Sequence, residues 1–436
     1  MGMSKTNYQT FWIVSICLFG LLLLAGCRKN SLNGQNPNVV PGLSQPIRIS
    51  SGNADAAEPA VAAATDGTVY VVWVDHDQKN EADVMIAHFT SDGRMKGSAV
   101  RVNSQAGVAT AWRGDPPSIV VAPDHTVYVG WTARVESDSG HATDLYLSSS
   151  QDQGQTFGPP VKVNDDTKPA VHGMHSLAVG TDGRIYLAWL DERNIAPMEM
   201  KDTKMDPGIK GHHMESNREL FFASSGDDGR TFTPNQRVAS DVCPCCKTAL
   251  AIGPDNRLYL SWRQVLPGDL RHIAVNSSVD QGKTFSSPKI VSDDQWMIAG
   301  CPVSGASISV TQDGNLRVLW FSGGKNGQTG LYSSISTDHG ASFLQRQLVA
   351  AGPIQGTPVL SNDAKSIRAI WASNEANAQK IFTAELSSKE KPDESFRIAE
   401  GMVPAATLTA TSLLVAYVTK GDQHQEIRVV SAPAGN

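Results

Sequence analysis

A short pattern of alternating residues that ends in an aromatic side chain recurs along this chain of 436 residues. A second apolar stretch precedes each copy, often across a turn such as Thr-Asp-Gly or Pro-Asp-Asn, and the two together predict a β-hairpin. Self-similarity of this kind is typical of solenoids and propellers. The aromatic residues that end the copies are Trp73, Trp131, Trp189, Trp262, Trp320, Trp371 and, in a weaker copy, Tyr417.

A second motif, Ser-x-Asp-x-Gly-x-(Thr/Ser)-Phe, occurs at 150–157, 225–232, 278–285 and 336–343. It predicts a tight turn in which Asp and Ser accept backbone N–H groups, Gly takes a positive φ and Phe packs beneath. The motif resembles the Asp-box (BNR repeat) of the sialidase superfamily, whose members are β-propellers. In that family the box is structural and lies far from the active site. The resemblance therefore implies no catalysis by Asp152, Asp227, Asp280 or Asp338.

The strand pattern also predicts how the ring closes. A short outer strand follows each motif or its degenerate equivalent, except after the last repeat, which ends at "EIRVVSAP". A strand of the same kind, "QPIRIS", lies at 45–50, toward the other end of the chain. Because a closed ring leaves no free sheet edge, we expect an all-β propeller of four-stranded blades whose N-terminal strand completes the last blade. The strand count predicts seven blades; six, the number in catalytic sialidases, is the alternative.

Composition adds limits on partners. The abundant Gly (38) and Pro (23) fit an all-β chain with many turns. The formal net charge of −6 gives no reason to expect nucleic acid as a partner. We expect a monomer.

The first residues predict targeting to the cell envelope. Lys5 is followed by an apolar run that is short for a membrane span and ends in small residues. Its end, "LAGC", resembles a bacterial lipobox, which implies a signal peptide over 1–26 and a lipid on Cys27. Residues 27–43 then form a flexible tether, and 44–436 form the propeller. We expect a lipoprotein on the membrane, outside the cytoplasm, where disulfides persist.

Four cysteines remain after processing, and the repeat register places them together. Cys243, Cys245 and Cys246, in "DVCPCCKTAL", open the inner strand of the fourth blade, and Cys301 opens that of the fifth. Cys243 and Cys301 each lie nineteen residues before the tryptophan of their own blade. "HGMHS" at 172–176 opens the inner strand of the third blade. These residues are therefore expected on one face, around the central channel.

Two interpretations of this face stay open. A metal site for copper or zinc is favoured by soft sulfur and imidazole donors, and an insertion at 194–217 adds further His and Met residues to the same face. Its candidate ligands are His172, Met174, His175, Cys243, Cys245, Cys246 and Cys301. The alternative is a disulfide between Cys243 and Cys301, joining neighbouring blades.

Sialidase activity is less well supported. The resemblance implies an Arg-Ile-Pro motif, an arginine triad, an Asp acid/base and a Tyr–Glu nucleophile pair. Ala57-Glu58-Pro59 and Asp115-Pro116-Pro117 stand where Arg-Ile-Pro would be expected, so the first arginine is missing. Weak catalytic candidates near the strand ends are Arg113, Asp191, Glu192, Arg193 and Arg263.

The sequence thus favours a lipid-anchored, extracytoplasmic, sialidase-like propeller. We expect it to act as a binding or accessory protein, for metal or for a carbohydrate or protein ligand, through its Cys/His/Met-rich face. The alternative function is a glycoside hydrolase of exo-sialidase type.

Overall fold

The computed structural model describes residues 39–434, apart from 80, 111–113, 138–140, 196–216, 299, 364–365, 376 and 387–393. All of these lie in one compact unit, Pro37–Asn436. The predicted signal peptide, Cys27, most of the insertion at 194–217 and Arg113 fall outside the described residues. Within the described part every regular element is a β-strand, and no helix there has the length and apolar character that crossing a membrane requires.

The strands pair in seven antiparallel sets of four, which we number in chain order from the inner strand outward. Set 1 is β2 (Asp55–Ala63), β3 (Val69–His76), β4 (Ala82–Phe89) and β5 (Met95–Arg101); set 2 is β7 (Ser118–Val121), β8 (Val127–Arg134), β9 (Thr143–Ser150) and β10 (Val161–Lys162). Set 3 is β11 (His172–Val179), β12 (Ile185–Asp191), β13 (Arg218–Ser225) and β14 (Gln236–Val242). Set 4 is β15 (Ala249–Ile252), β16 (Leu258–Leu266), β17 (Leu270–Ser278) and β18 (Lys289–Ile290).

The remaining sets repeat this order, and the last one draws on both ends of the unit. Set 5 is β19 (Ala306–Val310), β20 (Leu316–Ser322), β21 (Gly330–Ser336) and β22 (Gln347–Ala351); set 6 is β23 (Ile354–Asn362), β24 (Ile367–Glu375), β25 (Ala378–Glu385) and β26 (Phe396–Glu400). Set 7 is β27 (Met402–Leu408), β28 (Ser412–Lys420), β29 (Gln425–Pro433) and β1 (Ile47–Arg48). A further short strand, β6 (Ala109–Thr110), joins sets 1 and 2.

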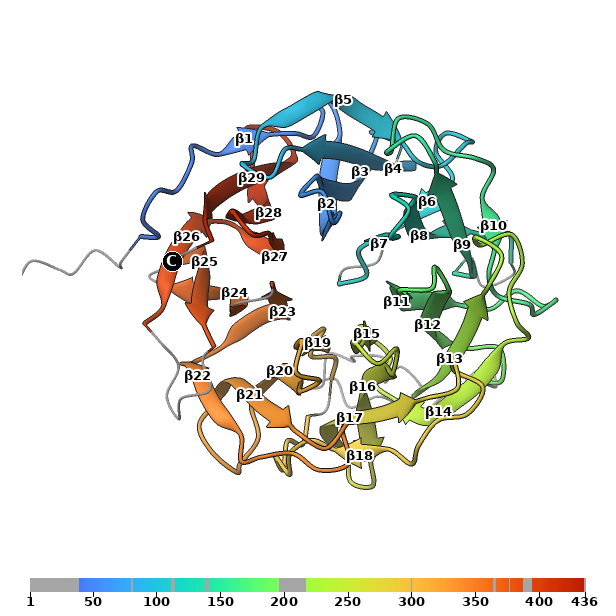
Figure 1. The fold of residues 1–436 in the computed structure, drawn as a ribbon, viewed down its shortest axis with the longest axis vertical. Coiled ribbons are helices and arrows are strands. Elements are labelled where there is room, and N and C mark those ends of the chain that lie inside the picture. The colour runs from blue at the N-terminus through green and yellow to red at the C-terminus, as the bar shows by residue number, and fades with distance from the viewer. Residues whose placement is uncertain are drawn as a thin grey trace, which may run out of the picture. The chain divides into compact units, whose positions relative to one another are not determined.

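The sets surround a common centre (Figure 1). β1 pairs with β29 through Ile47↔Val429 and Arg48↔Arg428, so the N-terminal strand completes the last set as predicted. The all-β propeller fold is therefore confirmed. The grouping of the strands agrees with the seven blades counted from the sequence.

The hydrophobic core is divided into clusters that lie between neighbouring sets. In the described residues each of seven buried clusters combines side chains of two consecutive sets, and one of them joins set 7 to set 1. Each repeat aromatic enters the cluster shared with the preceding set: Trp262, for example, packs with Leu220 and Phe222 of set 3. The recurring aromatic therefore exists because each sheet must bury its face against the next.

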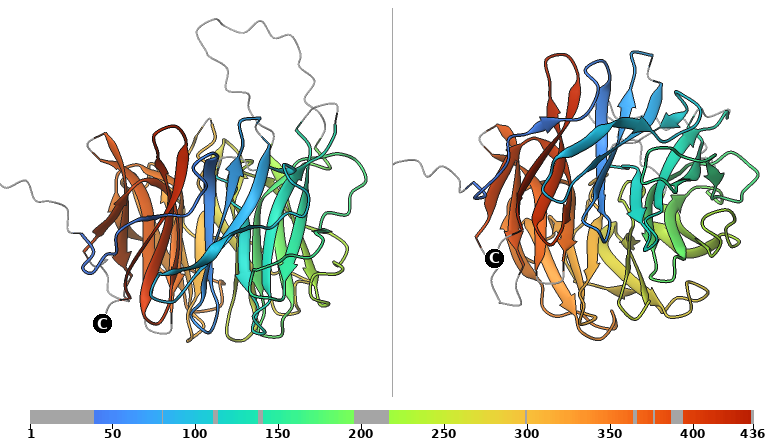
Figure 2. Two further views of the ribbon diagram at one scale, coloured as in Figure 1. Left: turned by 90° about the horizontal axis from the view of Figure 1, so that it is seen from above. Right: turned by 45° about the horizontal axis from the view of Figure 1, so that its top comes forward.

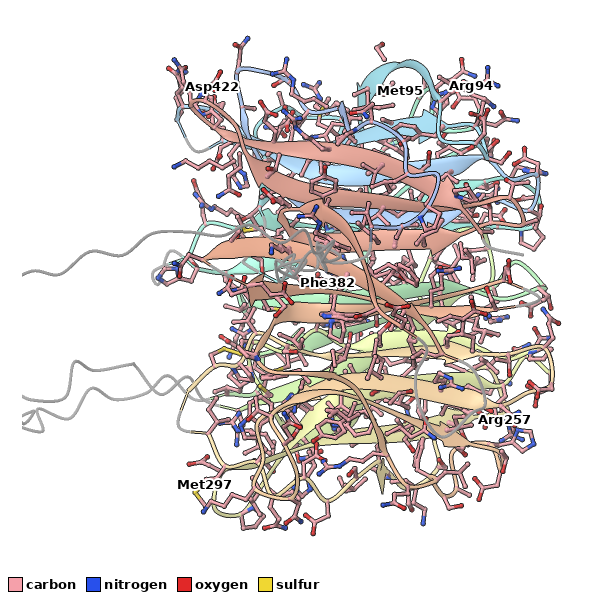
Figure 3. All side chains as sticks on the ribbon, turned by 90° about the vertical axis from the view of Figure 1, so that its left-hand side faces the viewer. Arg94, Met95, Arg257, Met297, Phe382 and Asp422 are labelled. Carbon is pink, nitrogen blue, oxygen red and sulfur yellow. A yellow bond between two sulfur atoms is a disulfide. The ribbon has the colours of Figure 1, made fainter. Side chains whose placement is uncertain are left out.

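The strands run between two ends of the ring (Figure 2). The turns from first to second strand and from third to fourth strand of a set lie at one end, where Figure 3 labels Arg257 and Arg94. The turns from second to third strand, and the connections between sets, lie at the opposite end, where Asp422 and Met297 are labelled. We call these the turn end and the connection end.

The four Asp-boxes at the turn end share one hydrogen-bond pattern. In the first, Ser150 Oγ accepts from the Gly154 N–H at 2.8 Å, and Asp152 accepts from the Thr156 N–H at 2.9 Å and from its hydroxyl at 2.6 Å. The other three repeat these bonds around Asp227, Asp280 and Asp338. The carboxylates are thus held inside their own turns, as the resemblance implied.

Candidate functional site

The inner strands of all seven sets surround a cavity of about 1170 Å³ at the centre of the ring. Most of its lining is apolar or small, and in the described part of the chain neither arginine nor tyrosine lines it. Its ionisable side chains are Asp55, Glu58, His76, Asp77 and Lys247. Arginine is the usual bidentate partner of a carboxylate, and among the described residues none lines this central channel.

A buried charged cluster stands beside the channel. Oδ1 of Asp115 lies 3.4 Å from Nδ1 of His175 and 3.6 Å from Nζ of Lys247. Nε2 of His175 lies 3.0 Å from the carbonyl oxygen of Gly130, and the Lys247 ammonium donates to the carbonyl of Pro116 at 3.1 Å. Asp115, His175 and Lys247 lie near the starts of inner strands in sets 2, 3 and 4, so the cluster ties three neighbouring sets together.

Opposing effects fix the charges of this cluster. Burial acts to raise the pKa of Asp115, but the neighbouring His175 and Lys247 outweigh it and bring that pKa down to about 2. Burial lowers the pKa of Lys247, against the attraction of Asp115 and Glu58. Asp115 is therefore a buried carboxylate at neutral pH that offsets the half-buried Lys247 ammonium, a pairing that is costly to break from one side.

The backbone at the start of the inner strands adopts a repeated, uncommon conformation. φ is positive at Glu58 (52°), Met174 (52°), Val303 (46°), Gly356 (70°) and Val403 (48°), which lie near the starts of the inner strands of five sets. Such values are rare for residues other than glycine and persist only where the surroundings impose them. The ring therefore sets the backbone here, while the side chain at this position varies among Glu, Met, Val and Gly.

The three clustered cysteines form a compact group of buried thiol sulfurs. The Cys243 N–H donates to the Arg263 carbonyl at 2.9 Å, which holds the turn that follows β14 against β16. Sγ of Cys243 lies 2.7 Å from Sγ of Cys246 and 3.9 Å from Sγ of Cys245. All three side chains are buried and share a core cluster with Met174. Their sulfur atoms lie within 4.8 Å of one another.

The disulfide of this group differs from the predicted one. Cys245 is joined to Cys301, with their Cα atoms 6.1 Å apart, so the predicted Cys243–Cys301 pairing is wrong in its first member. The reason is the β14–β16 ladder, which holds Cys243 in the core beside Trp262. Cys245 lies beyond Pro244, and Cys301 is exposed at the channel wall. The bridge thus connects the buried thiols to the central channel.

A buried arginine lies next to the thiols. Arg263 donates from Nε to the Ser304 carbonyl and from Nη2 to the Phe321 carbonyl, both at 3.0 Å. The hydrogen bond from Cys246 lowers the pKa of Cys243 to about 7, against burial and with help from Arg263, whereas burial raises the pKa of Cys246. One thiol of the pair is therefore readily ionised.

The histidines of the predicted ligand set face other partners. Nδ1 of His172 faces the Thr143 carbonyl, and Nε2 lies 3.2 Å from Asp166 and 3.4 Å from Asp191. Burial opposes protonation of His172, but these carboxylates raise its pKa. Both ring nitrogens of His172, like those of His175, therefore meet oxygen atoms, and of this segment Met174 alone shares the core cluster of the thiols.

The weak sugar-site candidates are engaged in the walls of the ring. Asp191 accepts from the indole N–H of Trp189 at 2.8 Å and from Nε of Arg193 at 3.0 Å. Glu192 pairs with Arg218 at 2.6 Å. Arg263 is fully buried, as described above. These residues therefore support the sheets, while Arg113 lies outside the described residues.

Two structural roles were not predicted from the sequence: the acceptors of the tryptophan indole N–H groups and the ion pair of Lys247. The indole N–H of Trp73 donates to Asp75 at 2.7 Å and that of Trp262 to Gln264 at 2.7 Å, as Trp189 does to Asp191. The spacing Trp-x-(Asp/Gln) in three repeats was the available signal, because a buried indole N–H needs an acceptor. Lys247 was also missed, since no local pattern marks a lysine that pairs with a buried carboxylate of another set.

Neither a protein-family model nor a curated protein matches this chain. Among solved structures, an ulvan lyase of polysaccharide lyase family PL25 is similar over 91% of this chain and 95% of its own, with 12% identity and a TM-score of 0.54. For the polysaccharide lyase Uly1 the coverages are both 94%, the identity 12% and the TM-score 0.52. The NanB sialidase from Streptococcus pneumoniae is similar over 91% of this chain and 98% of its own, with 11% identity and a TM-score of 0.46. At such identities the likeness concerns the fold and no particular family.

Proposed function

We propose that this protein is a cell-envelope binding protein that holds a soft metal ion, copper(I), at Cys243, Cys245 and Cys246. The observation that carries the proposal is the convergence of three buried sulfur atoms within 4.8 Å. Soft thiolates select copper(I), and zinc also accepts them. Since Cys245 is bridged to Cys301, the proposal concerns the reduced protein.

The surroundings support an anionic sulfur site for a cation. The thiols lie between sets 3 and 4. Among the described residues, the group of candidate ligand atoms that lie within 4.8 Å of one another contains these three sulfurs and no carboxylate or imidazole. Arg263 offsets the negative charge of thiolates, and Met174 adds a thioether to the same cluster. Burial keeps water from the sulfurs, which favours a soft ion over a strongly hydrated one.

The test is copper(I) titration of the reduced full-length chain, without oxygen, against a coloured competing chelator. We expect one tightly held copper(I) per chain, lost in Cys243→Ser and in Cys246→Ser. Met297→Ala removes an exposed thioether at the same end and is the matched control. A wild-type chain that fails to compete for copper(I) would overturn the proposal.

The variant Cys301→Ser distinguishes a copper(I) site from a zinc site. Zinc is bound by four ligands in structural sites, so a zinc site would need Cys301 as the fourth sulfur and would be lost in this variant. A three-sulfur copper(I) site would keep its ion. If the wild-type protein retained zinc but not copper(I), the site would be a zinc site and the copper(I) proposal would be wrong.

Anchoring at the membrane is part of the same proposal and is supported by the "LAGC" sequence. Cys27 carries the lipid, and the tether holds the propeller outside the cytoplasm. Growth with a labelled fatty acid tests this: we expect label on the wild-type protein and none on Cys27→Ser. A wild-type protein without label would refute the anchor but leave the metal site standing.

The alternative, an exo-sialidase, has less support because Asp191, Arg193 and Arg263 are committed to contacts in the walls. Release of a fluorophore from a sialoside would revive it, provided that Asp191→Asn or Arg263→Lys abolished the signal in a protein that still folds. A carbohydrate or protein ligand in the central channel remains compatible with the proposed binding role.

A further inference from the structure

The four cysteines form a continuous row of sulfur atoms from the core to the channel. Sγ of Cys246 lies 2.7 Å from Sγ of Cys243, which lies 3.9 Å from Sγ of Cys245, which is bonded to Cys301. Cys246 is fully buried, whereas Cys301 is exposed and lines the channel. A disulfide at one end of the row therefore lies next to a pair of thiols at the other.

We propose that this row is a thiol–disulfide relay, which moves one disulfide between Cys245–Cys301 at the channel and Cys243–Cys246 in the core. The relay uses the same sulfurs as the proposed metal site but needs no ion. The position of the disulfide then decides whether Cys301 faces the channel as a bridged sulfur or as a free thiol.

The first step starts from the arrangement in the structure. The Cys243 thiol gives up its proton and its sulfur attacks Sγ of Cys245, because this atom lies 3.9 Å away. A Cys243–Cys245 bond forms, the Cys245–Cys301 bond breaks, and the electron pair leaves with Cys301. Cys301 then takes up one proton and becomes an exposed thiol.

The second step places the disulfide in the core. Cys246 loses its proton and attacks Sγ of Cys243, its 2.7 Å neighbour, and Cys245 leaves with the electron pair and a proton. The Cys243–Cys246 bridge has then replaced Cys245–Cys301. One disulfide and two thiols are present before and after, so no external oxidant or reductant is consumed.

The local structure suits this exchange. The Cys243 N–H is anchored on Arg263, and the turn carbonyl of Pro244 accepts from Arg218 at 2.8 Å, so the backbone holds the sulfurs in place. Displaced Cys301 remains in the channel wall, where a small thiol compound can reach it.

The test follows Cys301 in the metal-free full-length chain. The oxidised protein is reduced to one disulfide per chain with one equivalent of a phosphine, the phosphine is removed, and samples are alkylated in acid at intervals. Peptide mass spectrometry then locates the disulfide. We expect two alternative disulfides, Cys245–Cys301 and Cys243–Cys246. The ratio of their amounts should change with time and then reach a constant value.

Two variants separate the relay from independent pairing. In Cys243→Ser the attacking sulfur is absent, so the labelled fraction of Cys301 should stay constant after the phosphine is removed. In Cys246→Ser the relay should stop at the first step and yield a Cys243–Cys245 linkage. Both variants are compared with wild type for their unfolding midpoints.

The wild-type chain alone decides the outcome if a variant fails to fold. A fixed ratio of linkages over time, or Cys245–Cys301 as the sole linkage, would overturn the relay. Copper(I) binding without exchange would leave the proposed function standing, and exchange without copper(I) binding would leave only the relay.

Discussion

The two ends of the ring are built by opposite rules. At the turn end four Asp-boxes repeat the same residues and the same hydrogen bonds, with the Gly N–H to Ser Oγ distance between 2.8 and 3.0 Å in every copy. At the connection end the strand starts share a backbone conformation but carry different side chains, among them Glu58 and Met174. The repeated Asp-box residues thus serve the fold of the ring, whereas the residues that vary between sets give the cysteine-containing sector its own chemistry.

The two ends also differ in how their charges are held. Asp152 and its equivalents lie in exposed turns and form short local bonds. Asp115 is buried and binds partners from two other sets. A charge held locally can be lost without disturbing its neighbours, whereas a buried shared charge cannot.

The largest expected effect is that of Asp115→Asn. Its removal leaves the half-buried Lys247 ammonium without its nearest counter-charge and leaves His175 without its carboxylate partner, and we expect a loss of about 3–5 kcal/mol in the free energy of unfolding. Urea denaturation at neutral pH measures it. Asp255→Asn, which loses an exposed 3.4 Å pair with Arg257 at the turn end, should change stability by less than about 1 kcal/mol. Equal losses in the two variants would contradict the contrast between the ends.

The next effect concerns the bridge at the connection end. Cys245–Cys301 closes a loop of sequence separation 56, so its loss in Cys301→Ser should cost about 2–4 kcal/mol. Reduction of the wild-type protein should lower the urea midpoint to that of the variant. If the reductant leaves the wild-type midpoint unchanged, the bridge does not contribute as the structure indicates.

The smallest effect belongs to the turn end and appears only in acid. The pKa of the four box carboxylates, Asp152, Asp227, Asp280 and Asp338, is lowered to about 2 from the model-peptide value of 3.8. The largest cause is the hydrogen bond from the Thr or Ser hydroxyl of the box, and the other side-chain and backbone hydrogen bonds within the box add to it. A depressed folded-state pKa stabilises the fold above the unfolded pKa, and this stability is lost as the pH falls toward 2.

Asp152→Asn tests this acid dependence. Urea midpoints from pH 5 to pH 2 should fall less steeply in the variant than in the wild type, since one of four such carboxylates is gone. Copper(I) binding at neutral pH should be unchanged. A variant that retains the full wild-type slope would show that the box carboxylates do not carry the acid sensitivity.

The local patterns of the sequence were enough for the fold. Alternating strands, the box motif and the missing last outer strand predicted an all-β propeller closed by the N-terminal strand, and Ile47↔Val429 confirms that closure. These signals are short-range, because strand alternation and turn chemistry depend on neighbours in the chain. The same register correctly brought the segments of Cys243, Cys245 and Cys301 to one place.

What the sequence could not supply is the direction of individual side chains. One residue separates Cys243 from Cys245, yet the β14–β16 ladder buries the first while the second is bonded to Cys301. His172 and His175 are close neighbours of Met174 in the chain. Their ring nitrogens nevertheless meet carboxylates and carbonyls, most of which come from set 2 and its connections. Such partners are fixed by packing between sets, and no local pattern records them.

The sequence by itself therefore determined the architecture of the ring, the repeated turns and the sector in which sulfur gathers. Only the tertiary structure decided which cysteine reaches the channel, which thiols touch, and that the neighbouring histidines are held by oxygen partners. The physical reason is that strands and turns follow from interactions along the chain. Pairings among buried polar groups and sulfur atoms follow instead from distances between residues as far apart as Cys245 and Cys301, which only the closed ring establishes.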